Sequence, residues 1–345
     1  MIWKNSLLVL GHRFAARISV FIVLTLMTAP SSPVMAQATV YLDTEGGAGF
    51  GNNPGSFLWN TSFSAVWTTD SSGNSSTVAW SNGTPANNAI LGNGASVGAS
   101  TAFLGGNISV GTIAVVNGTW TLELNGNTLT FDSAANSNLD ASISGSGSVV
   151  KTGTGTMVVT TSSNYSGGTT ISGGALRFIA ANANIGPTTI NSGGSLQIGA
   201  SATLSASTNL TLAGGSLALT GAFNQTFSTA LAMSAGSTID FGSGFGASAL
   251  AFGDSSGQTW TGTLLVTNFN TAGGDTLRFG STNNALTGTQ LSAISFDGIG
   301  AQIDSSGFVT PVPEPEIYAL LLGGVALAVF GYRRRNLAAT GAMSC

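Results

Sequence analysis

Residues 173–178 read GGALRF, and the stretches GGSLQI at 193–198 and GGSLAL at 214–219 repeat the same pattern. The three stretches begin roughly twenty residues apart, a period typical of solenoid coils. After each glycine pair, apolar residues alternate with small or polar ones. This period-two pattern, bounded by Gly, Asn and Ser, predicts short strands with one buried face. A repeat of this length with two or three strands corresponds to one coil of a right-handed parallel β-helix, so we expect an all-β solenoid.

The alternation also predicts which side chains face the core. Leu, Ile, Phe and Val would point inward, and Thr, Ser and Asn would face water. Shorter pieces of the same kind lie between the glycine pairs, at Thr189-Ile190 and at 210–212. A flexible low-complexity linker is the alternative. The regular placement of Leu, Ile and Phe disfavours it, because linkers lack such residues.

Residues 145–178 read GSGSVVKTGTGTMVVTTSSNYSGGTTISGGALRF. This stretch resembles the autotransporter-associated β-strand repeat, also called the passenger-associated transport repeat. The positions that fit its pattern are Lys151, Gly153, Gly155, Asn164, Tyr165, Gly167, Gly168, Thr169, Gly173, Gly174 and Leu176. The resemblance implies a β-helical passenger.

The segment VPEPEIYALLLGGVALAVFGYRRRN, at 312–336, differs from the rest of the chain. Its uncharged run at 317–332 would span about 24 Å as a helix, against about 30 Å for a hydrocarbon core, so it can cross a thinned membrane. The prolines before the run set its start, and the arginines after it would stay on the cytoplasmic side. A buried core helix is the alternative, which a triple-Arg end disfavours.

This segment resembles the PEP-CTERM sorting signal, in which Pro-Glu-Pro, one apolar helix and a basic end follow one another. The matching residues are Pro313, Glu314, Pro315, Arg333, Arg334 and Arg335. The resemblance implies that an exosortase in the inner membrane cuts near the Pro-Glu-Pro. The body would then be released, or transferred to the cell surface and the exopolysaccharide matrix.

The N-terminus carries the features of a secretory signal peptide. Lys4, Arg13 and Arg17 precede or border an apolar run at 18–27, and a small-x-small site, Val-Met-Ala, follows at 34–36. The pattern predicts cleavage by signal peptidase between Ala36 and Gln37 after export through the general secretion machinery. A retained N-terminal anchor is the alternative, which the short apolar run disfavours.

The charge of the chain is low. Charged residues make up 6% of its 345 residues, and the formal net charge is −4. Between Gln37 and Pro311 the cations are Lys151, Arg177 and Arg278. An acidic body with so few cations indicates that nucleic acid is not a partner.

The catalytic chemistry open to the exported part is narrow. The one histidine, His12, lies in the predicted signal peptide, and the one cysteine, Cys345, lies beyond the arginines. This excludes Ser-His and Cys-His catalysis and the usual zinc sites, and we expect no cofactor. Two carboxylates would suffice for glycoside hydrolysis. However, residues 145–236 contain no Asp or Glu.

Asp-Ser-Ser-Gly occurs three times, beginning at Asp70, Asp254 and Asp304. Asp at the first position and Gly at the fourth predict type I turns. A weak calcium site is the alternative.

The region 37–132 is richer in aromatic residues. We expect its tryptophans to cap or fill the first coils, with a platform for sugar rings as the less favoured alternative. These tryptophans are Trp59, Trp67, Trp80 and Trp120. Strands are expected at 102–104, 108–116 and 119–131.

The segments expected from the sequence are a signal peptide at 1–36, an N-terminal β region at 37–132, a β-solenoid at 133–310, a sorting signal at 311–336 with its membrane helix at about 317–332, and a cytoplasmic tail at 337–345.

Two functions follow as hypotheses. The first is a non-catalytic surface or matrix protein that contributes to exopolysaccharide or biofilm architecture or to adhesion, by binding exopolysaccharide or copies of itself. The second is a β-helical polysaccharide-active enzyme, a hydrolase or a lyase. An enzyme needs two acids, or an acid and a base, converging on one coil face. The scarcity of cations disfavours the lyase.

Overall fold

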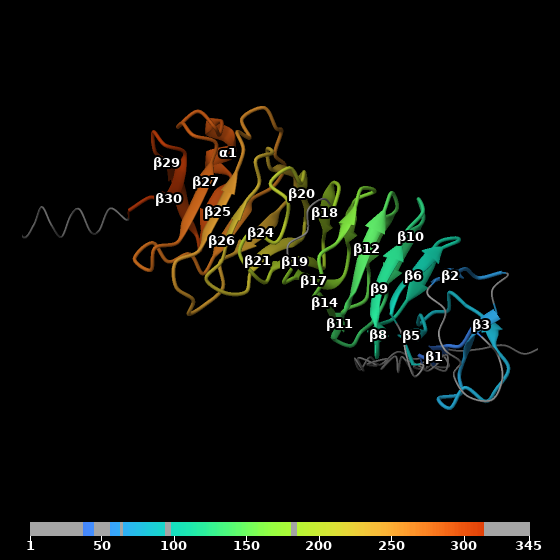
Figure 1. Cartoon of the computed structure of the whole chain (residues 1–345). Coiled ribbons are helices and arrows are strands. Elements are labelled where there is room, and N and C mark those ends of the chain that lie inside the picture. The colour runs from blue at the N-terminus through green and yellow to red at the C-terminus, as the bar shows by residue number, and fades with distance from the viewer. Residues whose placement is uncertain (1–36, 45–55, 63–64, 94–97, 181–184, 314–345) are drawn as a thin grey trace, which may run out of the picture. The chain divides into compact units, whose positions relative to one another are not determined.

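The computed structural model describes residues 37–44, 56–62, 65–93, 98–180 and 185–313, all of which belong to the unit Ala36–Cys345 (Figure 1). Their strands form four sheets, whose members follow in pairing order. Sheet A is β4 (Val78–Ala79), β3 (Ala65–Thr68), β1 (Thr39–Leu42), β5 (Asn88–Leu91) and β8 (Ile113–Val115). Sheet B is β15 (Asn164–Tyr165), β12 (Ala141–Gly145), β9 (Thr119–Glu123), β6 (Ala99–Leu104) and β2 (Ser56–Trp59).

Sheet C is β23 (Ala232–Ala235), β20 (Leu210–Ala213), β18 (Thr188–Asn191), β16 (Thr169–Ile171), β13 (Ser148–Lys151), β10 (Thr128–Phe131) and β7 (Ile108–Val110). Sheet D is β11 (Ser137–Leu139), β14 (Thr156–Val159), β17 (Gly174–Phe178), β19 (Gly194–Ile198), β21 (Ser216–Leu219), β24 (Ser237–Asp240), β26 (Leu264–Thr267), β28 (Ile294–Phe296), β29 (Ile299–Ile303), β30 (Phe308–Pro311), β27 (Thr276–Phe279), β25 (Ala249–Phe252) and β22 (Asn224–Thr226).

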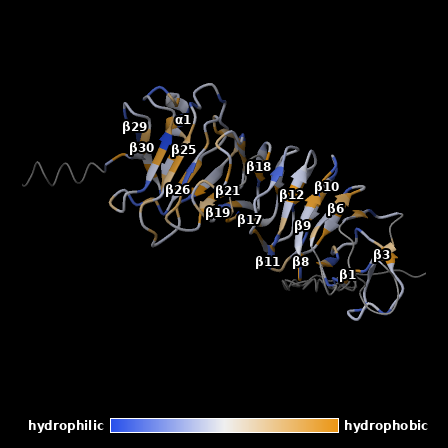
Figure 2. Cartoon of the chain, in the orientation of Figure 1, coloured by the Kyte–Doolittle hydropathy of each residue, from blue (hydrophilic) through white to orange (hydrophobic). Residues whose placement is uncertain are grey.

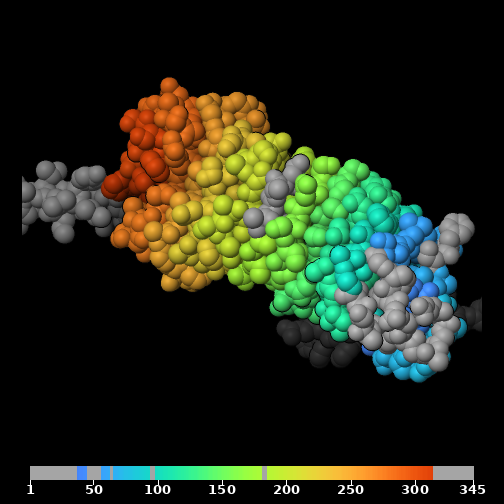
Figure 3. All heavy atoms as spheres, viewed as in Figure 1, coloured from blue at the N-terminus to red at the C-terminus, as the bar shows by residue number. Residues whose placement is uncertain are grey.

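The chain visits these sheets in turn, so each coil pairs in parallel with the coil before and after it. Thr169 of β16 pairs with Val149 of β13 on one side and with Thr188 of β18 on the other. Paired residues in these coils lie about twenty positions apart, the expected solenoid period. In Figure 3 the colours of the chain accordingly follow one another in bands. The prediction of an all-β parallel solenoid is confirmed, and its right-handed sense stays a prediction.

The core is a stack of inward apolar side chains. Leu176, Leu196 and Leu217 pair in register across β17, β19 and β21, and all three are fully buried. Their strand neighbours Phe178 and Ile198 are buried as well. Burying a side chain of this size contributes about 1.5–3 kcal/mol. The inward register read from the sequence is confirmed, and Figure 2 shows apolar strands recurring along the stack.

Two glycines of the repeat allow neighbouring coils to touch backbone to backbone. A Cβ at Gly153 would collide with the main chain of Ser133 in the preceding coil. Gly174, with φ +56°, would collide with the carbonyl oxygens of Gly153 and Gly155. A side chain at either position would push the coils apart, which explains why the repeat needs glycine there.

The N-terminal end of the core is closed by indole rings. The ring centroids of Trp59, Trp67 and Trp80 lie 4.9 to 5.0 Å apart, and all three side chains are buried. Trp120 is buried too and meets Phe57 edge to face at 6.1 Å. The prediction of a core or capping role is confirmed, and the alternative of an exposed sugar platform is wrong for these four residues.

Side chains also cover the two outer edges of sheet C. At β7, Trp80 Nε1 donates to Ser109 O at 3.1 Å, and Asn82 Oδ1 accepts from Ser109 N at 2.8 Å. Beside β23, Trp260 Nε1 donates to Leu231 O at 2.9 Å. Edge strands are thereby kept from pairing further. The last strands of sheet D turn antiparallel: β29 pairs with β28 on one side and with β30 on the other, and β30 pairs with β27.

Some sequence expectations need correction. The segments 108–116 and 119–131 are each two strands rather than one, because the chain turns a corner within them. At the second corner Asn125 and Gly126 take positive φ values of 49° and 78°. A five-residue helix, α1 (Gly288–Ser292), begins with a capping box between Thr287 and Gln290. Across the described ranges, no helix has the length and apolar character needed to span a bilayer.

Candidate functional site

The body ends where the predicted sorting signal begins. Val312 N donates to Gly300 O at 2.8 Å, and Pro313, the first residue of the Pro-Glu-Pro, is exposed directly after it. An enzyme that reads this motif would therefore meet its first residue next to the last strand, β30. The other predicted sorting residues, Glu314, Pro315, Arg333, Arg334 and Arg335, and the apolar run at 317–332, lie outside the described residues.

Of the two residues that flank the predicted signal cleavage site, the structure describes Gln37. Ala36 lies outside the described residues. Gln37 packs on the first coil, where its Nε2 donates to Ala86 O at 2.6 Å. The residue expected to begin the mature chain is therefore attached to the body.

Lys151 and Tyr165, two side chains that define the repeat, act within the body of the solenoid. Lys151 is 2% exposed, and its Nζ donates to the carbonyl oxygens of Gly153 and, at 3.4 Å, of Gly173. Burial lowers the pKa of this amine, partly offset by the nearby charge of Asp132. The ammonium thus links its own turn to the next coil.

Tyr165 acts inside the core. Its hydroxyl lies 2.7 Å from Thr169 Oγ1, and both side chains are buried. Burial raises the pKa of Tyr165 well above its ordinary value. A phenol enclosed in this way stays neutral and does not reach a substrate, so the repeat motif is explained by packing.

Two carboxylates that a polysaccharide-active enzyme could use, those of Asp240 and Asp275, have local roles. Asp275 accepts from Ser248 N at 2.9 Å and from Asn270 N at 2.8 Å. Asp240 accepts from Gly242 N at 2.9 Å and from the side chain of Asn268 at 2.7 Å. Both side chains therefore fix loops. Among the described residues no cluster of three or more His, Cys, Asp or Glu is placed to hold a metal ion.

Two of the three Asp-Ser-Ser-Gly stretches form turns at the predicted positions. Gly73 N donates to Asp70 O, and Gly307 N donates to Asp304 O, each at 3.1 Å. The turn after Asp254 is shifted by one residue, with Gln258 N donating to Ser255 O at 2.9 Å. Hydrogen bonds from the hydroxyl and backbone of Ser72 lower the pKa of Asp70 to about 2.

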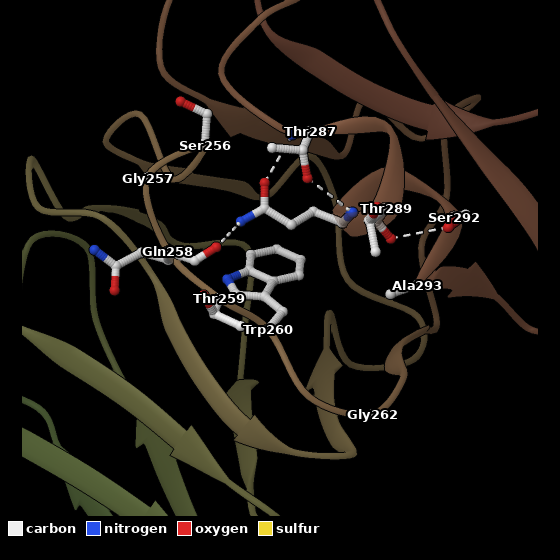
Figure 4. Close-up of a pocket in the computed structure, with 11 residues that line it drawn as sticks. Ser256, Gly257, Gln258, Thr259, Trp260, Gly262, Thr287, Thr289, Ser292 and Ala293 are labelled. Atoms are coloured by element: carbon white, nitrogen blue, oxygen red, sulfur yellow. Dashed lines mark hydrogen bonds between the residues drawn. The ribbon is translucent and has the colours of Figure 1, made fainter.

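A cleft of about 550 Å³ opens in the C-terminal coils (Figure 4). The half-buried ring of Trp260 lies in it. Gln290 Nε2 donates to Ser255 O at 2.7 Å and to Gln258 O at 2.8 Å, which ties α1 to the facing loop. The residues that line the cleft are Ser256, Gly257, Gln258, Thr259, Trp260, Gly262, Thr287, Thr289, Gln290, Ser292 and Ala293.

None of these lining residues is ionisable, so the cleft offers an aromatic ring, hydroxyls and amides but no group for proton transfer. Sequence reasoning missed it. The signal available was Thr287-x-x-Gln290, the spacing of a capping box, which marks a helix start inside an otherwise β sequence.

The outer face of sheet C carries a row of hydroxyl groups, interrupted at Val150. Thr130, Val150, Thr170, Thr189 and Thr211 pair in register and are all partly exposed. Neighbouring strands are about 4.8 Å apart, so the hydroxyls from Thr170 onward repeat at nearly constant spacing. The expectation that Thr faces outward is confirmed for this row and is wrong for Thr169 and Thr188, which are buried.

Residues 149–178 match the family model of the passenger-associated-transport-repeat. The match falls within the stretch that carries the resemblance, so that resemblance is confirmed. It spans β13 to β17. No curated protein and no solved structure matches the chain. The repeat and the solenoid fit an exported, passenger-like surface protein. The resemblance of 312–336 to the PEP-CTERM signal stays a prediction.

Proposed function

We propose that this chain is a non-catalytic protein of the cell surface or extracellular matrix, sorted by an exosortase and active through its polar outer faces. The observation that carries the proposal is the register-matched hydroxyl row on sheet C. No acid occurs between Asp140 and Asp240, so the coils that carry most of this row lack carboxylates altogether. A single hydrogen bond contributes about 0.5–1.5 kcal/mol, and many of them in a fixed array hold a polymer.

The occupants that suit this surface are exopolysaccharide and further copies of the chain. Both offer hydroxyl or amide groups along their length, as the solenoid does. In this proposal the precursor is held in the inner membrane and reaches the surface or matrix of a biofilm once the exosortase has cut it. The exposed position of Pro313 next to β30 supports access for that enzyme.

Cell fractionation tests the sorting half of the proposal. Cells with and without their exosortase are separated into membrane, surface and medium, and the C-terminus of the protein is determined by mass spectrometry. We expect a C-terminus near Pro313 in the surface fraction, and an uncut, membrane-bound chain without the exosortase. The same C-terminus in both strains would refute exosortase sorting.

A polysaccharide panel tests the non-catalytic half. The exported protein is incubated with neutral and acidic polysaccharides, then assayed for co-sedimentation and for new reducing ends. We expect binding without cleavage. Release of reducing ends that is abolished by Asp240→Asn or Asp275→Asn, and kept by Asp297→Asn as a control, would instead establish the polysaccharide-active enzyme.

A further inference from the structure

The outer face of sheet D contains a groove of about 530 Å³ around Arg177. Arg177 of β17 lies between Val158 of β14 and Gln197 of β19 in register. Its neighbours Leu176 and Phe178 fill the core, so alternation directs the Arg177 side chain outward. The groove is lined by Asn136, Ser137, Asn138, Thr156, Val158, Arg177 and Gln197.

The guanidinium of Arg177 makes no hydrogen bond or ion pair with another described residue. Its Nε is shielded from solvent but has no hydrogen-bond partner among the described residues. The other two cations of the described body are engaged. Arg278 donates from Nε to Ser306 O at 3.1 Å and lies 5.5 Å from the ring centroid of Phe308, and Lys151 donates to backbone carbonyls. A shielded donor without a partner costs free energy, which a ligand oxygen would recover.

The charge around the groove favours an anion. Lys151 and Arg177 are the charged residues between Asp140 and Asp240, although the whole chain has a net charge of −4. In the register of sheet D the acids on either side are Asp140, which follows β11 two strands before Arg177, and Asp240, three strands beyond it. Two strand spacings with a two-residue offset are about 12 Å and three strand spacings are about 14 Å, both beyond the screening length of about 8 Å at physiological salt. The carboxylate of Asp140 also accepts from Thr160 Oγ1 at 2.6 Å. Arg177 is thus electrostatically available.

Amides flank the cation on both sides. Gln197 pairs with Arg177 in the next coil, and Asn138 pairs with Val158 in the coil before it. Neither amide side chain is hydrogen-bonded to another described residue. Together with the guanidinium they present donors over four successive coils, while Thr156 and Ser137 add hydroxyl groups.

We propose that this groove binds a carboxylate-bearing polysaccharide, with the guanidinium of Arg177 on the carboxylate and the amides on neighbouring sugar oxygens. A planar guanidinium forms two parallel hydrogen bonds with a carboxylate, which favours uronate over a neutral sugar. This inference rests on the proposed surface function and narrows its ligand class to acidic polysaccharide.

Binding of polygalacturonate by the exported protein tests the site, with dextran as the neutral polymer and dextran sulfate as a competitor. The variants are Arg177→Gln and Arg177→Lys, and Arg278→Gln is the matched control, since it removes the other arginine of the described solenoid. We expect Arg177→Gln to weaken polygalacturonate binding at least about tenfold, equivalent to about 1.4 kcal/mol. The affinity of Arg177→Lys should lie between those of the parent and Arg177→Gln, and Arg278→Gln should bind as the parent does.

Circular dichroism confirms that each variant is folded, and a double Asn138→Ala, Gln197→Ala variant supplies a second test that leaves the cation in place. This double variant should also bind polygalacturonate less tightly. Three results would overturn the inference. The first is that the parent does not bind polygalacturonate, and the second is that Arg177→Gln and Arg278→Gln lose equal affinity. The third is that dextran sulfate competes more strongly than polygalacturonate itself. Dextran binding that survives in Arg177→Gln would leave the proposed surface function standing when this site fails.

Discussion

Leu196 gives the most direct test of the coil register. Its side chain is fully buried in β19, between Leu176 and Leu217 of the adjacent coils. Truncating a buried leucine to alanine costs about 2–5 kcal/mol, because the transfer free energy is lost and a cavity remains. Aspartate at this position adds an unpaired buried charge to that loss. Since folded domains are stable by about 5–15 kcal/mol, Leu196→Ala should survive and Leu196→Asp should not.

Urea unfolding followed by far-ultraviolet circular dichroism measures this difference on the exported protein. Ser195→Asp is the matched control, because Ser195 precedes Leu196 in the same strand and pairs with Ser216 on the outer face. We expect the parent and Ser195→Asp to unfold at similar urea concentrations, Leu196→Ala to unfold earlier, and Leu196→Asp to lack β structure without urea. If Leu196→Asp unfolds at the parent's midpoint, Leu196 does not face the core and the register is wrong.

Three further predictions concern single residues. Gly153→Ala should destabilise the protein by more than about 1 kcal/mol, because its Cβ would meet the main chain of Ser133. Gly106→Ala is the control, since Gly106 has open space around it, and equal melting temperatures for the two variants would contradict the prediction. Burial lowers the pKa of Lys151, so the unfolded chain binds this proton more tightly than the folded one. The stability of the parent relative to Lys151→Met should therefore rise as the pH increases from the folded pKa toward 10.5. Urea titrations at several pH values measure this difference, and a fall over that range would show that the sign is wrong. Glu314→Ala should leave the chain uncut and membrane-bound, since the motif is what an exosortase reads; normal processing on immunoblots would exclude that role.

The regular part of this fold can be read from the sequence because its signals are local. Each glycine pair is followed by alternating apolar residues, and alternation fixes which side chains face the core. It predicts that Leu176, Leu196 and Leu217 are buried, and they are. The physical reason for the spacing of the glycines is not local. It depends on the contact of Gly153 with Ser133 in another coil, a residue far away in sequence.

Corners are harder to predict than strands, because the apolar alternation continues across them. The expected strand at 119–131 is broken at Asn125 and Gly126, although Asn-Gly is a known turn signal that could have divided it. For the tryptophans, the sequence does not show whether the side chains are buried. Their residue type suits both a sugar platform and a core, and the burial of Trp59 and Trp67 against each other settles the matter. Residue type alone does not contain that information.

The uncharged cleft shows where irregularity enters the solenoid. Up to β24 each turn of sheet D adds about twenty residues, but Leu264 of β26 pairs with Ile294 of β28, an interval of roughly thirty. The added residues include α1, and Gln290 of that helix is bonded to the loop at Ser255 and Gln258. A regular stack can therefore lengthen a coil without disturbing the pairing on either side, since the insertion lies outside the ladder. The body therefore carries two kinds of surface. The flat faces repeat similar contacts from coil to coil, whereas the loop beside Trp260 lines an open, uncharged cleft within a longer coil.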